Sequence, residues 1–257
     1  NLYAFSPWID YPLTIKDGTG SLSINIEFEN GKLKEGGSSF SVQNLNANTI
    51  DNAKQGLVFK DISGEFEYKL VNDDINIILD NLFLTTNSKL QFEDSAASIK
   101  YNFETNQINK ATLVVDRFDL GSVKEISNQF LPEEHRVNVI INELEARGEI
   151  DDFKLKWDRT RDEEEPNLKL KAKFLELEIN EFESFPGLKN ITGEVNIENE
   201  KGIIRSVSRD VKITKEDIFR APLQLNQFTG SVNWDNQKYS FNEVTIKDDY
   251  MEAIFNG

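Results

Sequence analysis

The chain has no cysteine, a single histidine and a single methionine among its 257 residues. Without cysteine it has no disulfide framework and no thiolate that could act as nucleophile or ligand. No run of about 18 apolar residues occurs, so the sequence predicts no membrane-spanning helix. No initiator methionine or signal peptide stands at Asn1, and we expect the chain to be a piece of a longer protein.

Positive charge is also scarce in this sequence. The chain has 29 Lys and Arg residues against 45 Asp and Glu residues, which gives a formal net charge of −16. A charge of this sign argues against nucleic acid as a partner. It also argues against broad electrostatic docking onto anionic lipid headgroups.

Residues that could carry chemistry are few. His135 is the sole histidine and stands in a charged stretch, which is typical of a surface residue rather than a catalytic base. Neighbouring acids have no EF-hand spacing, and we expect them at hairpin turns, where Asp is favoured for backbone reasons. These acids are Asp73-Asp74, Asp151-Asp152, Asp162 to Glu165 and Asp248-Asp249. We therefore predict no catalytic residue, no metal site and no cofactor.

The sequence has instead a recurring strand motif. It occurs as Ile62-Ser63-Gly64-Glu65-Phe66, Ile191-Thr192-Gly193-Glu194-Val195 and Phe228-Thr229-Gly230-Ser231-Val232, with looser copies at Gly20 and Gly148. After each glycine, apolar side chains take every second position, which is the period of a strand with one dry and one wet face. A glycine at this place suits a bulge or a bend. The repetition predicts one β-hairpin unit used many times.

The predicted fold class is all-β and mainly antiparallel. We expect an elongated, curved sheet of roughly fifteen strands, spaced by about 4.8 Å, that fills residues 1–257 as a single segment. A hydrophobic content of 38% together with 18 phenylalanines favours a sheet with one apolar face. Only Val123, Ile126 and Phe130 follow helical spacing, which predicts one short helix over residues 121–131. Strands should resume from Val137 to Ile141.

Local signals predict where strands turn or bend. Asn30-Gly31 is a hairpin signal, and Gly36-Gly37 and Asp94-Ser95 indicate further breaks. The alternation changes phase near Leu175, which predicts a bulge there.

Alternation also assigns side chains to the two sides of the sheet. One side should hold the apolar set Leu22, Ile24, Ile26, Phe66, Tyr68, Ile77, Leu79, Ile99, Tyr101, Val115, Leu170, Val195, Ile197 and Val232. The other side should hold the polar neighbours Ser23, Asn25, Glu65, Glu67, Lys100, Lys169, Lys171, Glu194 and Asn196.

Several segments occur in an order that carries a family resemblance. They are the strand at Gly20, the run from Val115 to Leu120 into the helix before Pro132, the hairpin from Glu145 to Trp157, Phe185 to Gly193, and Ala221 to Trp234. In this order, over most of the chain, the sequence resembles the central region of YhdP-like proteins, within the AsmA-like superfamily of Gram-negative envelopes.

The resemblance implies a function as well as a fold. It implies a periplasmic protein that is anchored to the inner membrane, with the anchor and its envelope partners outside this segment. A non-enzymatic β-groove would carry phospholipid acyl chains towards the outer membrane. The fourteen apolar residues named above would then line that groove.

The alternation by itself leaves other solutions open. A closed barrel or a two-sheet sandwich would bury the apolar side in a dry core, as in a structural or interaction module. A carbohydrate-active enzyme would instead need two carboxylates about 5 to 9 Å apart in a cleft. Trp8, Trp157 and Trp234 could line a ligand surface, although buried packing is the commoner use of tryptophan. The resemblance favours the groove.

Overall fold

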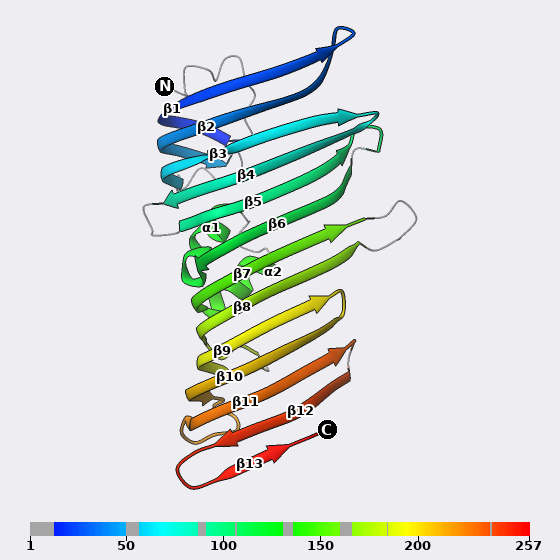
Figure 1. The fold of residues 1–257 in the computed structure, drawn as a ribbon. Helices are drawn as coiled ribbons and strands as arrows, with labels where there is room; N and C mark the ends of the chain where they lie inside the picture. Colours follow the sequence, from blue (N-terminus) through cyan, green and yellow to red (C-terminus); the bar gives the residue numbers. More distant parts are fainter. Residues whose placement is uncertain are drawn as a thin grey trace.

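The computed structural model describes residues 13–49, 57–86, 91–105, 107–130, 136–159, 166–183, 185–236 and 238–257. In this part of the chain, one 13-stranded sheet contains every strand, and each strand pairs antiparallel with its neighbours in sequence (Figure 1). The strands are β1 (Leu13–Glu29), β2 (Lys32–Thr49), β3 (Leu57–Val71), β4 (Asp74–Thr86), β5 (Gln91–Asn102), β6 (Gln107–Asp119), β7 (Arg147–Asp158), β8 (Asn167–Ile179), β9 (Gly187–Glu198), β10 (Lys201–Thr214), β11 (Leu223–Asp235), β12 (Lys238–Lys247) and β13 (Glu252–Phe255).

The sheet is open, because β1 and β13 stand at its two edges and do not pair with each other. This confirms the predicted elongated, curved antiparallel fold. It also excludes a closed barrel or a two-sheet sandwich for the strands that the structure describes.

The pairing register places all fourteen predicted apolar residues on one face of the sheet. Directly opposed residues of an antiparallel pair point to the same side. One such row runs through Ile24, Ser38, Phe66, Leu79, Ala97, Leu113, Leu155, Leu170 and Ile197. The predicted polar neighbours point the other way, as Glu65 does opposite Ser39 and Lys171 opposite Asn196. We call these two sides the apolar face and the polar face.

Most strands contain a residue in the left-handed conformation in mid-strand. These residues are Asn44, Asn81, Asp94, Asp152, Glu176, Asn190, Asp210 and Glu243. The register shifts at several of them, as between Asp151 and Lys154 and between Phe174 and Leu177, which marks β-bulges that bend the strands. The bulge predicted near Leu175 is thereby confirmed. We call this line of bulges the crease.

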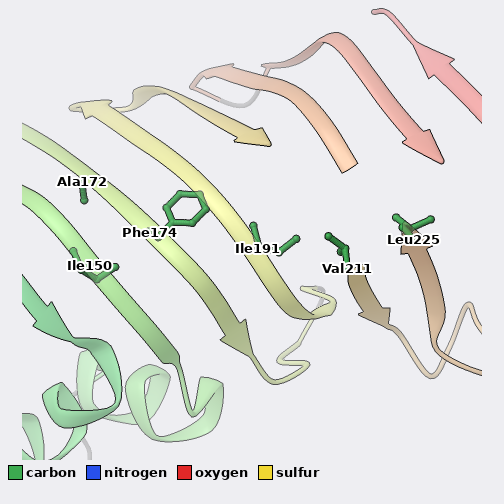
Figure 2. Close-up of a cluster of buried hydrophobic side chains, with 6 residues drawn as sticks. All are labelled: Ile150, Ala172, Phe174, Ile191, Val211 and Leu225. Carbon is green, nitrogen blue, oxygen red and sulfur yellow. The ribbon is translucent and has the colours of Figure 1, made fainter. Parts of the chain in front are cut away.

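Buried apolar side chains follow the crease from strand to strand. Ile150, Ala172, Phe174, Ile191, Val211 and Leu225 form one cluster across β7 to β11, and Figure 2 shows them in a row. Ile150, Ala172, Phe174 and Ile191 belong to the apolar face by register. Val211 and Leu225 oppose each other just past the left-handed Asp210 and join the same cluster. Val211 and Leu225 are only 0% and 1% exposed. The core is therefore made by the bent sheet itself.

A short helical insertion interrupts the strands between β6 and β7. A 3-10 turn, η2 (Leu120–Ser122), leads into α1 (Val123–Phe130), which confirms the helix predicted over residues 121–131. The carboxylate of Asp119 starts the turn by accepting a hydrogen bond from the Ser122 amide at 3.0 Å.

A second helix, α2 (Arg136–Leu144), replaces the strand predicted from Val137 to Ile141. Its register is set by polar contacts with α1. The Ser127 hydroxyl donates to Asn138 Oδ1 at 3.0 Å, and the amide of Asn142 donates to Asn128 Oδ1 at 2.7 Å. Asn138 and Asn142 are four residues apart, so the helix sets them one turn apart on the side that meets α1.

Three predicted breaks or turns lie inside strands. Gly36-Gly37 belongs to β2, and the ring of Tyr68 fills the space above Gly36. Asp94-Ser95 belongs to β5 and Asp151-Asp152 to β7. Asp94 and Asp152 take left-handed bulge positions, which Asp tolerates in strands as it does in turns.

Candidate functional site

The apolar face is the largest candidate functional surface in the described part of the chain. Towards β1 its side chains are well exposed, with Leu22 at 63% and Ile24 at 59%. Towards β13, Phe241 is 45% and Phe255 51% exposed. At about 4.8 Å per strand, thirteen strands give a surface on the order of 60 Å long.

Charged side chains are kept off this face. Between the hairpin turns and the crease, the directly opposed residues of this face from β3 to β12 include no Asp, Glu, Lys or Arg among the described residues. Charges gather on the polar face as cross-strand ion pairs. Examples join Lys100 to Asp74 at 2.8 Å and Arg205 to Glu194 at 2.8 Å. Such exposed pairs contribute only about 0–1 kcal/mol each, so their main effect is a hydrated outer surface.

Aromatic rings make up much of the apolar face around the crease and beyond it. Phe118 lies edge-on to Phe92, with ring centroids 5.8 Å apart, and edge-on to Phe153 at 5.6 Å. Phe66 and Tyr68 lie 6.0 Å apart. Tilted and edge-to-face arrangements of this kind are the favoured geometry of aromatic pairs.

Glycines opposite aromatic residues flatten this face. The register sets Gly36 opposite Tyr68, Gly64 opposite Phe40, Gly193 opposite Phe174 and Gly202 opposite Trp234. In each pair the ring occupies the space that a side chain on the glycine would need. Two recurring glycines of the sequence motif, Gly64 and Gly193, therefore lie beneath a ring of the neighbouring strand. Two others, Gly148 and Gly230, have φ of +122° and +141°.

A depression of about 730 Å³ borders the apolar face at Trp234 and Tyr239, beside the turn between β11 and β12. Two others lie mainly towards the polar face. One of about 570 Å³ is lined mainly by polar-face residues such as Asn25, Glu67 and Asn76. Another of about 520 Å³ lies beside Lys171 and Asp152. Both are wide and open to solvent, and neither collects the apolar side chains that a ligand pocket usually presents.

Several residues singled out in the sequence lie outside the described ranges. They are His135, the acidic run from Asp162 to Glu165, and Trp8. Trp157 and Trp234 are described, and both are half-buried on the apolar face rather than fully buried. Within the described residues no three His, Cys, Asp or Glu side chains stand close enough together to hold a metal ion.

The fold and this face define an open, one-sided β-sheet protein with an extended apolar surface. The chain belongs to the YhdP protein family, whose pattern it matches over residues 3–253. No curated protein and no solved structure matches it. Among the described residues, neither helix is long and apolar enough to cross a membrane.

Proposed function

We propose that this chain is a non-enzymatic, lipid-carrying segment of a periplasmic bridge between the inner and outer membranes. Its apolar face would hold phospholipid acyl chains, and the anchor to the inner membrane would lie elsewhere in the protein. The observation that carries this proposal is an apolar surface that continues through the whole open sheet and stays exposed towards both edges. Membership of the YhdP family supports it.

The chemistry of the face fits acyl chains without a dedicated headgroup site. Each buried methylene contributes about 0.8 kcal/mol, so a dozen methylenes provide on the order of 10 kcal/mol before the entropy of binding is subtracted. A surface that lacks charges but extends over many strands can offer this contact at successive positions. That property suits passage along a surface better than retention in one pocket.

The alternative of a structural module with a closed, dry core has less support. A closed core requires the apolar side to be covered by a second layer. The side chains of Leu22, Ile24 and Phe241 are instead 63%, 59% and 45% exposed. The described strands also form a single layer. We therefore assign the face to a ligand rather than to the core of a scaffold.

The proposal is tested by placing a charge on exposed positions of the apolar face. Ile24→Asp and Phe241→Asp should lower the amount of co-purified phospholipid, because a carboxylate is expensive to bring into hydrocarbon. Asn25→Asp and Asn242→Asp add the same charge at the adjacent residues of the polar face and should leave bound lipid unchanged. Lipid is measured by native mass spectrometry and lipid extraction after expression in a bacterial periplasm.

The two pairs of variants also control for folding, because all four positions are well exposed and circular dichroism should give the same strand content for each. Equal lipid in the four variants would contradict the proposal. So would the absence of lipid from the unmodified protein.

A further inference from the structure

Tryptophan and tyrosine are gathered along one border of the apolar face. Among the described residues they are Tyr68, Tyr101, Trp157, Trp234, Tyr239 and Tyr250. All but Tyr250 lie on the apolar face, next to the turns of the hairpins β3–β4, β5–β6, β7–β8 and β11–β12. The strand ends at these turns share one side of the sheet, on the right in Figure 1. We call the five residues the hairpin rim.

The crease has a different aromatic composition. Phe118, Phe153 and Phe174 lie there, and Phe118 and Phe153 are in ring contact. Phenylalanine has no polar atom, whereas the indole N–H and the phenol O–H seek a polar partner. Trp and Tyr are accordingly enriched where a hydrocarbon region meets water and headgroups. The apolar face therefore differs between its two sides: rings with a polar atom lie at the hairpin rim, and rings without one lie at the crease.

The width of the face fits the length of an acyl chain. Residues 168 to 174 of β8 lead from Leu168, which lies opposite Trp157, to the buried Phe174. Six residues of extended strand span about 20 Å. The hydrocarbon of one bilayer leaflet is about 15 Å thick, half of the whole core. A chain that starts at the rim can therefore end at the crease.

A cation stands at the rim as well. The guanidinium of Arg159 lies 5.4 Å from the centre of the Trp157 ring, and its Nη1 donates to Gln107 at 3.4 Å. This position lies just beyond the last apolar residue of β7, which is where the phosphate of a lipid would stand if its acyl chains pointed to the crease.

We propose that the hairpin rim is the headgroup side of the lipid path. The glycerol ester region would lie against its Trp and Tyr rings, and the acyl chains would run along the strands towards the crease. This inference rests on the proposed function, because it gives the orientation of the lipid that the apolar face carries.

The experiment uses tryptophan fluorescence and phospholipids spin-labelled either near the glycerol ester or near the terminal methyl group. Trp8→Phe with Trp234→Phe leaves Trp157 as the rim probe. Phe228 packs against the buried cluster of the crease. Replacing all three tryptophans by Phe and adding Phe228→Trp therefore gives a crease probe, for which Phe153→Trp is the substitute if the first does not fold. The rim probe should be quenched more by the label near the ester, and the crease probe more by the label near the methyl end.

The outcomes separate this inference from the proposed function. Equal quenching by both labels at the rim, or the reverse order, would overturn the assignment of the rim while lipid binding stands. No quenching by either label at either probe would show that the face does not bind phospholipid, and the proposed function itself would fail.

Discussion

Gly202 of β10 lies directly opposite Trp234 of β11, and the indole ring fills the space where a side chain at position 202 would stand. Gly202→Ala should therefore displace the ring and lower the free energy of unfolding by about 1–3 kcal/mol, the usual cost of overpacking. Urea denaturation measures this loss, and tryptophan emission should shift to longer wavelength as the ring moves towards water.

Gly37→Ala is the matched control for this prediction. An added Cβ at Gly37 would meet its nearest neighbour at 3.6 Å, which is an ordinary contact, and alanine is easier to order than glycine. Its unfolding free energy should be unchanged or slightly higher. A Gly202→Ala protein as stable as Gly37→Ala would show that the ring does not need the glycine.

The crease depends on residues that accept a left-handed backbone. Asp210 has φ 53°, and its carbonyl accepts a hydrogen bond from the Asn190 amide at 3.1 Å. Asp210→Val should lower the unfolding free energy by about 1–2 kcal/mol, because a Cβ-branched residue is strained in this region. Asp210→Gly keeps the carbonyl and relieves the strain, so it should remain close to the unmodified protein. Equal stabilities of the Val and Gly variants in denaturant would contradict a left-handed bulge here.

The two faces of the sheet were predictable from the sequence alone. Side chains alternate along any strand, so residues such as Leu170 and Lys171 are separated before the partner strands are known. The bulges were harder to recognise. Asp94 and Asp152 were expected at turns, because the left-handed conformation that Asp tolerates serves a turn and a bulge equally well.

Helix α2 and the hairpin rim needed the structure. The run from Val137 to Ile141 is apolar enough for a strand, and its helical register appears only when Asn138 meets Ser127 of α1. The rim combines residues from hairpins far apart in the sequence, such as Tyr68 and Trp234. Their alignment on one border follows from the pairing of all the strands between them, which no local pattern encodes.

One ion pair should make stability depend on pH. Lys215 donates to Glu181 Oε1 at 2.6 Å, and the Glu216 amide donates to Oε2 at 3.0 Å. The hydrogen bond between Lys215 and Glu181 lowers the pKa of Glu181. The same bond raises the pKa of Lys215. The contribution of Glu181 is present above the ordinary carboxyl pKa of about 4.3 and is lost as pH falls through its lowered value. That of Lys215 is present below about 10.4 and is lost as pH rises through its raised value.

Lys215→Met should therefore be less stable than the unmodified protein at neutral pH, and the difference should shrink as Glu181 becomes protonated below about pH 4.3. Thermal unfolding across this range measures it. Lys189→Met, at an exposed pair with Glu178, is the control and should have a smaller effect. A stability difference for Lys215→Met that is constant from neutral to acidic pH would contradict the pairing.

The central claim is that the apolar face contacts lipid, and site-specific photo-crosslinking in living cells tests it most directly. A benzophenone amino acid is placed at Leu170 and Val195 on the apolar face, and at their neighbours Lys171 and Asn196 on the polar face. In the full-length protein in a Gram-negative envelope, irradiation should attach phospholipid at Leu170 and Val195 and leave Lys171 and Asn196 free of it. Adducts of equal yield on both faces, or none at Leu170 and Val195, would contradict the account.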